Sequence, residues 1–305
     1  MPHVRRRVAL PAIVAFTMLA TFALAPGASA TFPDRNGRIA FQAQTDHGVQ
    51  IFTIRPNGHD LRQITHLDGD ATAPDWSPDA GRIAFTFNDC SVAIMDADGS
   101  DLSLIADDPD LCQSDPSFTP DGTRLVFEHF DWKGTGADEV WSMEPDGSDK
   151  QFITGAGAVD PNVSPDGRKL SFKGAEGALF VQNMDGSGLV QVSPTVSVAY
   201  KSDWAPDAQR LIFGDNSEPA PGEPVNIWTV RPDGTDLRDL TNYAGPTRAW
   251  VGGYSPDGQW IVFRLEQDGL FTLYRMRPDG SDLHAILQSS TFVPRSIDWG
   301  PAADR

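Results

Sequence analysis

The sequence predicts an all-β protein, a six-bladed β-propeller built from four-stranded antiparallel blades. Three observations carry this prediction. A turn frame of the type Trp-Ser-Pro-Asp-Gly recurs along the chain, a second frame ending in Asp-Gly or Asn-Gly lies between its copies, and the two ends of the chain hold complementary halves of one unit. Apolar segments of strand length separate the turns, a spacing typical of strands rather than helices.

The first frame is clearest in the segment 75–85, DWSPDAGRIAF. Its proline presets φ at one corner of a tight turn, and a glycine tolerates positive φ at the next. The copies centre on Pro78, Pro120, Pro165, Pro206, Pro256 and Pro301, at intervals of 41 to 50 residues. Ser77 has Ala205 and Gly300 as counterparts, and a nucleophile would be neither repeated nor replaceable. We therefore expect Ser77 to form a turn and not to act in catalysis.

The second frame follows an apolar run and is itself followed by a short segment that closes on an apolar residue. Its copies end at Gly58, Gly99, Gly147, Gly186, Gly234 and Gly280. Four strands in a repeat of this length indicate a propeller blade, and blades must stack in a ring to bury both of their faces. The segment 96–101, DADGSD, resembles a calcium loop, but its glycine is misplaced for one and its pattern recurs in other units, so a hairpin turn is expected.

The ends of the chain predict how the ring closes. The first unit starts at 36–41, NGRIAF, with no Trp-Ser-Pro segment before it, whereas 298–301, DWGP, has no strand after it. Together these halves make one blade, which gives six blades with the last strand paired beside the first.

The Trp-Ser-Pro-Asp-Gly…Ile-Ala-Phe…Asp-Gly-Ser…Leu-Thr frame resembles the WD-like propeller repeat of TolB-type proteins, a repeat also found in the propellers of tricorn and dipeptidyl-peptidase-like proteases. The resemblance covers residues 36 to 301 and implies the propeller domain only. TolB carries an additional N-terminal α/β domain, for which residues 30 to 36 leave no room. The resemblance implies a protein-binding role with a partner in the cell envelope.

The first thirty residues predict an export signal. Arg5, Arg6 and Arg7 precede an apolar run, and Ala28-Ser29-Ala30 fits a cleavage site. We therefore assign 1–30 to a signal peptide cleaved near Ala30, and 31–305 to the propeller, a mature chain without a membrane span in the periplasm or outside the cell. An uncleaved membrane anchor is the alternative.

Net charge limits the classes of binding partner, and the cysteine content predicts a disulfide. Loss of the three arginines takes the formal net charge from −18 to −21, which disfavours nucleic acid and anionic lipid and leaves basic partners or cations. Acidity that only maintains solubility is the alternative. Cys90 and Cys112 predict one disulfide on the long-loop face, next to acidic residues that offer a possible cation site.

The predicted topology also places a candidate site. The tight proline turns share one face of the ring, so the long loops share the other, where binding usually resides. Residues just ahead of each Trp-Ser-Pro equivalent should line the channel mouth there: Asp75, Asp115, Asp160, Lys201, Asp203, Trp250, Arg295 and Asp298. Such a ring can hold a cation, a peptide terminus or a polar ligand. In the alternative, the acids bond backbone amides where the strands start.

These residues favour a non-enzymatic binding or scaffold protein that engages a protein or peptide partner. The histidines lack a paired metal spacing, and we predict no catalytic residue, resident metal or cofactor. The alternative is a hydrolase or lyase that acts on an extracellular polymer at the channel mouth, with a metal or an acidic pair as catalyst.

Overall fold

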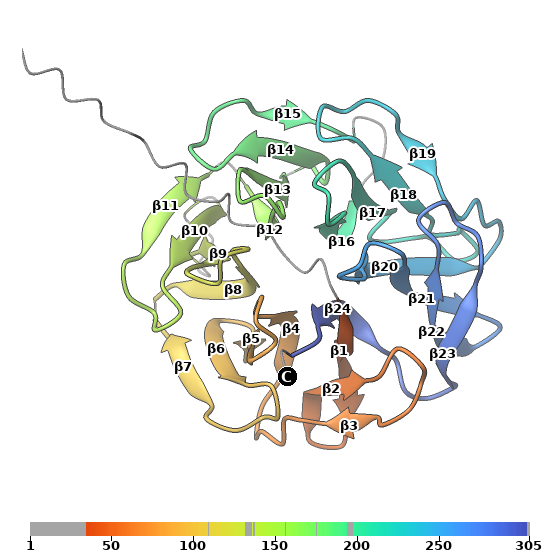
Figure 1. Ribbon diagram of the computed structural model, residues 1–305, viewed down its shortest axis with the longest axis horizontal. Helices are drawn as coiled ribbons and strands as arrows, with labels where there is room; N and C mark the ends of the chain where they lie inside the picture. Colours follow the sequence, from red (N-terminus) through yellow and green to blue (C-terminus); the bar gives the residue numbers. More distant parts are fainter. Residues whose placement is uncertain are drawn as a thin grey trace, which may run out of the picture.

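The computed structural model describes residues 35–303, except 109, 132–135, 137, 156, 175 and 194–197. The predicted signal peptide lies outside the described residues. In this part of the chain, no helix is long and apolar enough to cross a membrane. Six sheets of four strands surround a central axis, as Figure 1 shows, and the predicted six-bladed propeller is confirmed.

Blades are numbered here in ring order. Blade 1 contains β24 (Arg295–Pro301), β1 (Asn36–Thr45), β2 (Gly48–Ile54) and β3 (Arg62–Gln63). Blade 2 contains β4 (Ala71–Trp76), β5 (Arg82–Phe87), β6 (Ser91–Asp96) and β7 (Ser103–Ala106). Blade 3 contains β8 (Cys112–Phe118), β9 (Leu125–Phe130), β10 (Glu139–Met143) and β11 (Gln151–Thr154).

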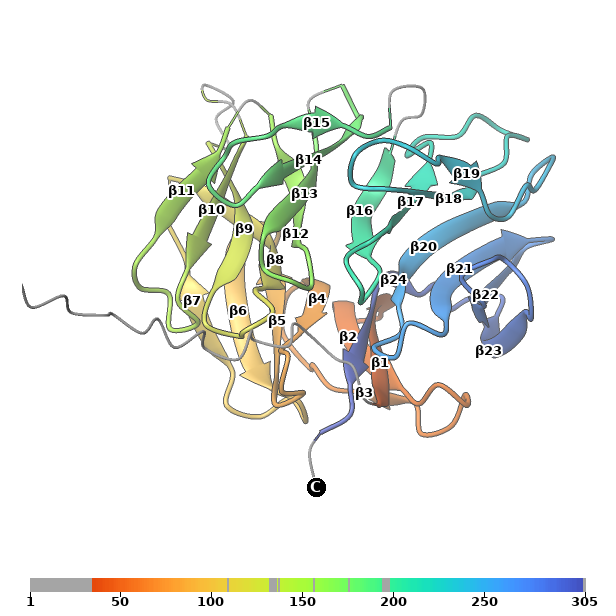
Figure 2. The same ribbon diagram turned by 45° about the horizontal axis from the view of Figure 1, so that its top comes forward.

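The second half of the ring repeats this order. Blade 4 contains β12 (Val159–Val163), β13 (Lys169–Lys173), β14 (Leu179–Asn183) and β15 (Val190–Gln191). Blade 5 contains β16 (Val198–Trp204), β17 (Leu211–Asp215), β18 (Ile227–Val230) and β19 (Arg238–Asp239). Blade 6 contains β20 (Arg248–Tyr254), β21 (Ile261–Gln267), β22 (Leu270–Met276) and β23 (His284–Ser289). The first strand of each blade faces the axis, and blades three places apart face each other across it (Figures 1 and 2).

The ring closes as predicted. Strand β24 pairs antiparallel with β1, with Ile39 opposite Trp299 and Asn36 opposite Pro301. The closure is tight, because a Cβ atom on Gly37 would lie 1.8 Å from the carbonyl oxygen of Pro301. The first and last strands therefore share blade 1 and hold the two ends of the ring together.

The turn frame has the role predicted for it. The Ser77 hydroxyl donates to Asp79 at 2.6 Å and accepts from the Arg82 amide at 2.8 Å, which fixes the turn between β4 and β5. This bond to Ser77 is the main cause that lowers the pKa of Asp79. Ser77 and Asp79 are thus structural residues. In the second frame, the Asp98 carboxylate accepts from the Ser100 amide and hydroxyl, so the calcium-like segment is a hairpin turn.

The core lies between adjacent blades. The second strand of each blade buries a phenylalanine at the same position of the repeat: Phe41, Phe85, Phe127, Phe172, Phe213 and Phe263. An apolar side chain removed from water in this way contributes about 1.5–3 kcal/mol. Because each phenylalanine packs between two blades, the core is continuous around the ring and holds the channel walls in place.

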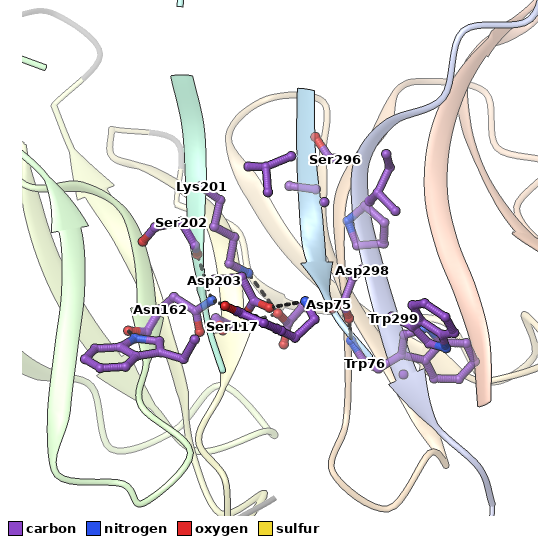
Figure 3. Close-up of a pocket in the computed structure, with 18 of the residues that line it drawn as sticks. Asp75, Trp76, Ser117, Asn162, Lys201, Ser202, Asp203, Ser296, Asp298 and Trp299 are labelled. Carbon is purple, nitrogen blue, oxygen red and sulfur yellow. Dashed lines mark hydrogen bonds and ion pairs between the residues drawn. The ribbon is translucent and has the colours of Figure 1, made fainter. Parts of the chain in front are cut away.

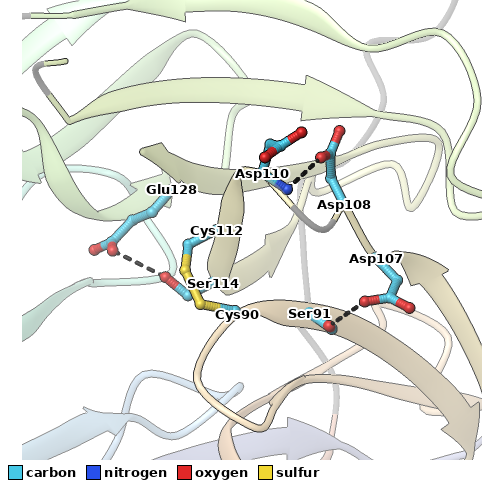
Figure 4. Close-up of a disulfide and its surroundings, with 8 residues drawn as sticks. All are labelled: Cys90, Ser91, Asp107, Asp108, Asp110, Cys112, Ser114 and Glu128. Carbon is cyan, nitrogen blue, oxygen red and sulfur yellow. Dashed lines mark hydrogen bonds between the residues drawn. A yellow bond between two sulfur atoms is a disulfide. The ribbon is translucent and has the colours of Figure 1, made fainter. Parts of the chain in front are cut away.

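The predicted disulfide is present. Cys90, between β5 and β6, is bonded to Cys112 at the start of β8, so the bond joins blade 2 to blade 3 (Figure 4). The acids beside it are engaged locally. Asp107 accepts from the Ser91 hydroxyl at 2.9 Å, and Asp108 accepts from the Asp110 amide at 2.9 Å. The possible cation among these acids stays a prediction.

Replacing both cysteines by serine is expected to lower the free energy of unfolding by about 3 kcal/mol, because the bond closes a 22-residue segment and restricts the unfolded chain. Urea unfolding of the oxidised protein and the double variant measures the difference. The wild-type protein in a thiol reductant should match the variant. An unchanged midpoint in both samples would show that the bond contributes nothing to stability.

Candidate functional site

A cavity of about 220 Å³ follows the propeller axis between the inner strands. Its lining includes all eight residues predicted for the channel mouth: Asp75, Asp115, Asp160, Lys201, Asp203, Trp250, Arg295 and Asp298. Prolines of the tight turns, among them Pro78 and Pro206, line its other end. The structure therefore gathers the predicted residues in one cavity, whereas their role in binding stays a prediction.

An ion pair crosses this channel. Lys201 on β16 of blade 5 donates from Nζ to Oδ1 of Asp75 on β4 of blade 2 at 2.8 Å (Figure 3). Blades 2 and 5 face each other, so the lysine side chain spans the axis. It is only 31% exposed and its partner 12%. The bond joins opposite walls of the ring.

Three of the eight residues bond backbone amides of the following blade. In each case, a carboxylate accepts from the amide of the aromatic residue that ends the next inner strand. The bonds join Asp298 to Trp76 at 2.7 Å, Asp75 to Phe118 at 2.8 Å and Asp203 to Tyr254 at 2.6 Å. The alternative stated for these acids thus holds in part. Asp75, Asp203 and Asp298 do bond backbone amides and hold neighbouring blades in register, but those amides lie where the next inner strands end and not where they start.

Burial governs the ionisation of Asp203 and Asp298. It raises the pKa of Asp298 to about 8, with a further contribution from the nearby Asp75, and it raises the pKa of Asp203 to about 6. Burial alone would lower the pKa of Lys201, but the attraction of Asp75, Asp298 and Asp203 outweighs it and holds that pKa above its usual range. Lys201 is therefore the cation that offsets the buried carboxylates of the channel.

A second group of acids lies on blades 3 and 4. Asp115 and Asp160 line the cavity, and Glu128 is buried behind them, with the carboxylate oxygens of the three residues within 4.8 Å of one another. Glu128 accepts from the Asp160 amide at 2.5 Å and from the Ser114 hydroxyl at 3.0 Å. These three carboxylates are close enough to share a cation.

Burial and neighbouring carboxylates shift the ionisation of Asp115 and Glu128. Burial raises the pKa of Asp115 to about 7 and that of Glu128 to about 8, and the neighbouring carboxylates add to both shifts. Lys173 on β13 lies 3.2 Å from Asp160 and supplies one positive charge. With the pKa values of Asp115 and Glu128 raised to about 7 and 8 and Lys173 beside Asp160, this wall carries little net negative charge near neutral pH.

The opposite wall is basic. Arg264 on β21 of blade 6 lines the cavity, is 5% exposed, and donates from Nη1 to the Pro294 carbonyl at 3.0 Å. Its guanidinium carbon lies 5.2 Å from the centre of the Trp250 ring, within the range of a cation–π contact. Arg295 on blade 1 lines the same part of the cavity and is exposed.

Sequence reasoning missed Glu128, Lys173 and Arg264, which lie on second strands. The signal was present in the repeat. In the Ile-Ala-Phe frame, the residue after the phenylalanine contacts the inner strand of the following blade in several copies, as Gln42 does with the Ala73 amide and Thr86 with the Asp115 amide. Its six copies are Gln42, Thr86, Glu128, Lys173, Gly214 and Arg264. The other three copies are uncharged. The charged copies Glu128, Lys173 and Arg264 therefore mark blades 3, 4 and 6 as the blades that carry charge beside the cavity.

The fold and the cavity define a six-bladed propeller with a polar, two-signed channel. No family model matches the chain. An uncharacterized protein of Agrobacterium fabrum is 25% identical over 220 residues, which cover 69% of this chain and 68% of that protein. A TolB homolog of Chlorobium luteolum is 26% identical over 206 residues, 65% of this chain and 45% of its own length. The chain thus spans less than half of that relative.

Solved structures share the fold. The crystal structure of TolB from Acinetobacter baumannii superposes with a TM-score of 0.72 at 18% identity and covers 87% of this chain and 67% of that one. An oligogalacturonate lyase in complex with manganese superposes with a TM-score of 0.56 at 16% identity and covers 84% of this chain and 76% of that one. Together with the six-bladed ring, these neighbours support a TolB-like propeller, and identities this low show the fold alone.

Proposed function

We propose that this chain is an exported, non-enzymatic propeller that binds a protein or peptide partner of the cell envelope at the long-loop mouth of its channel. The observation that carries the proposal is the axial cavity. Its acids and bases come from all six blades, and Asp75, Asp203 and Asp298 already hold neighbouring strands in register. Such a lining is rigid and polar, which suits recognition of a ligand by charge and hydrogen bonding.

The proposed organisation is a signal peptide at 1–30 followed by the mature propeller at 31–305. Two observations support export: the basic and then apolar N-terminus with its Ala28-Ser29-Ala30 pattern, and the disulfide between Cys90 and Cys112. Disulfides persist in oxidising compartments such as the periplasm and the cell exterior. The similarity to TolB proteins supports a partner in the envelope.

One observation favours a second function. The acidic group of Asp115, Glu128 and Asp160 can hold a cation, and a lyase in complex with manganese shares the fold. A lyase or hydrolase acting on a polymer at the channel mouth is therefore the alternative. Against it, Glu128 accepts two hydrogen bonds from its own surroundings and Asp160 faces Lys173, so each of these two carboxylates already has a structural partner.

Site-directed photo-crosslinking in the organism that encodes the chain tests the proposal. A photoreactive amino acid at Arg295 lies in the channel mouth, and one at Arg168, whose side chain is 83% exposed beside a proline turn, serves as the matched control. We expect one envelope protein to be captured from position 295 and not from position 168. Equal capture at both positions, or none at 295 together with cleavage of oligogalacturonate by the purified protein, would contradict it.

A further inference from the structure

The hairpins of the second frame differ in charge around the outer rim of the ring. Their first residue is an arginine in three successive blades, 5, 6 and 1, and an acid or an amide in blades 2, 3 and 4. From blade 1 to blade 6 these residues are Arg55, Asp96, Glu144, Asn183, Arg231 and Arg277. Among these six hairpins, all of which the structure describes, an arginine hairpin adjoins an acidic hairpin only at the seam between blades 1 and 2 (Figure 1).

Blade 1 carries an excess of positive charge at this seam. Three arginines share the carboxylate of Asp60, with Arg38 at 2.8 Å, Arg55 at 3.3 Å and Arg62 at 2.8 Å. Arg55 and Arg62 contact it through Nε, and their side chains are 57% and 58% exposed. The Nη groups of these two arginines donate no hydrogen bond within the described part of the chain. Because one carboxylate cannot neutralise three guanidinium groups, this side of the seam offers exposed donors that fit carboxylates.

Blade 2 carries the opposite excess. Its hairpin holds Asp96, Asp98 and Asp101, and the last two are exposed. In blades 1, 3 and 5, the arginine ahead of the Ile-Ala-Phe frame pairs with the carboxylate that corresponds to Asp101. In blade 2, the equivalent Arg82 lies over the ring of Phe118, 5.8 Å from its centre. Among the described residues, Asp96 and Asp101 form no ion pair, so the arginines of blade 1 do not neutralise the acids of blade 2 within one copy.

Two exposed leucines lie between these groups of charges. Leu104 on β7 is opposite Ala93, which packs with Ile64 of blade 1, so Leu104 lies on the face of blade 2 that is turned toward blade 1. Leu102 is two residues earlier and shares this face, and the two leucines are 43% and 50% exposed in chain order. The seam is rigid, because a Cβ atom on Gly99 would lie 2.2 Å from the Ile64 carbonyl oxygen. Its surface therefore runs from arginines through leucines to carboxylates.

We propose that this seam binds the same seam of a second copy of the chain. A surface that runs from arginines through leucines to carboxylates is complementary to itself after a half-turn. A two-fold axis parallel to the propeller axis keeps the hairpins of both copies on one face and sets hairpin 55–60 of each copy opposite hairpin 96–101 of the other. The arginine–carboxylate contact then occurs twice, around the leucines, as in an isologous dimer.

The acidity of the whole chain does not oppose this contact at physiological ionic strength. Charges farther apart than about 8 Å are largely screened there, whereas pairs in contact are screened much less. The repulsion between the remote acidic surfaces of two copies is therefore weak beside the attraction at the seam. The contact lies on the outer rim and is independent of the ligand proposed for the channel.

Sedimentation equilibrium of the mature, disulfide-bonded protein at physiological ionic strength measures the association. We expect a monomer–dimer equilibrium with a dissociation constant of about 1–100 µM, since the contact between two rims is small and its charged groups are exposed. A protein that stays monomeric up to about ten times the upper value of this range would overturn the proposal.

Two single variants test which residues meet. Arg55→Asp and Asp96→Arg exchange residues that the repeat already uses at this position, so each variant hairpin has a counterpart elsewhere in the ring. Each variant places like charges opposite each other at both contacts and should weaken dimerisation about ten-fold or more. The matched controls Arg231→Asp and Glu144→Arg make the same changes of charge on blades 5 and 3, and each should leave the dissociation constant within about two-fold. Thermal unfolding shows that each variant is folded.

An equimolar mixture of Arg55→Asp and Asp96→Arg tests the two-fold symmetry directly. In a dimer of one copy of each variant, both contacts join a carboxylate to a guanidinium group, whereas both homodimers oppose like charges. Native mass spectrometry separates the two variants by mass and should show the mixed dimer as the dominant dimer, with an affinity close to that of the wild-type protein. Absence of the mixed dimer, or equal weakening by Arg55→Asp and Arg231→Asp, would overturn the proposed contact.

Discussion

Replacing Lys201 by methionine is expected to lower the free energy of unfolding by about 2–3 kcal/mol at pH 8. The side chain crosses the channel to Asp75 at 2.8 Å and is the cation nearest to Asp203 and Asp298. Removing one partner of a buried ion pair costs about 3–5 kcal/mol because it leaves an uncompensated charge. We reduce that figure because Lys201 is 31% exposed and water screens part of the interaction.

The loss in free energy of unfolding caused by Lys201→Met should increase as the pH rises. The pKa of Asp298 is raised to about 8 and that of Asp203 to about 6, both above the ordinary value of 3.8. Between about pH 4 and these values, the folded chain binds more protons than the unfolded chain, so stability falls as the pH rises. Without Lys201 these pKa values rise further. The difference between variant and wild type should therefore be smaller at pH 5, where Asp203 and Asp298 are mostly protonated and chiefly the bond to Asp75 is lost, and it should grow toward pH 8, since each additional proton held contributes about 1.4 kcal/mol per pH unit.

Urea unfolding at pH 5, 6, 7 and 8 measures this dependence. Arg168→Met removes one exposed positive charge outside the channel and should stay within about 0.5 kcal/mol of wild type at every pH. The double variant Lys201→Met/Asp75→Asn should recover part of the loss at pH 8, because it also removes the carboxylate left without a partner. A cost for Lys201→Met that is the same at pH 5 and pH 8 would show that Asp203 and Asp298 play no part, and it would assign the effect to the bond with Asp75 and the packing of the lysine methylenes.

The fold was predictable because every repeat shows the same pattern of strands and turns, so each one predicts a blade independently of the others. Ser77, Asp79 and Phe85 have counterparts with the same contacts in most blades, so errors in one unit are corrected by the others. Closure between β1 and β24 was predictable for a related reason, since the halves at 36–41 and 298–301 complete one another. Pairing of Cys90 with Cys112 followed once the topology had placed both on one face.

The site was predictable only to the level of which strands line the channel. A repeat assigns positions to the inner strand but does not say which blades face each other until their number is known. The contact of Lys201 with Asp75, 126 residues away in the chain, depends on blades 2 and 5 being opposite. Whether an acid caps a strand or faces the cavity is decided by a shift of two residues. Asp75 and Asp203 accept amides, whereas Asp115 and Asp160 lie two residues ahead of that position in their own strands.

Ending the chain at Pro294 is expected to abolish the cooperative native state. The change removes β24, which pairs with β1 and contributes the buried Ile297 and Trp299 to the core of blade 1. It also removes Asp298, whose carboxylate accepts the Trp76 amide of blade 2. The loss exposes the edge of β1 and opens the ring at its one covalent break, so blades 1 and 2 lose their shared contacts together.

A point variant tests the same closure with less disruption. In Gly37→Ala, the added methyl group would lie 1.8 Å from the Pro301 carbonyl oxygen, so β1 and β24 must move apart. We expect a loss of about 3 kcal/mol or more. Gly155→Ala is the matched control, because a Cβ atom there would have ordinary contacts no shorter than 3.7 Å, and it should cost less than about 1 kcal/mol.

Near-ultraviolet circular dichroism and calorimetry report on the truncated chain, and urea unfolding reports on the two glycine variants. A synthetic peptide spanning 291–305 should restore the native signal to the truncated chain if β24 acts as the closing strand, because the peptide can pair with the exposed edge of β1. The opposite result would be a sharp thermal transition after truncation, together with a Gly37→Ala variant as stable as Gly155→Ala. It would mean that stacking of the other five blades is sufficient to hold the ring and that pairing of β24 with β1 does not stabilise it.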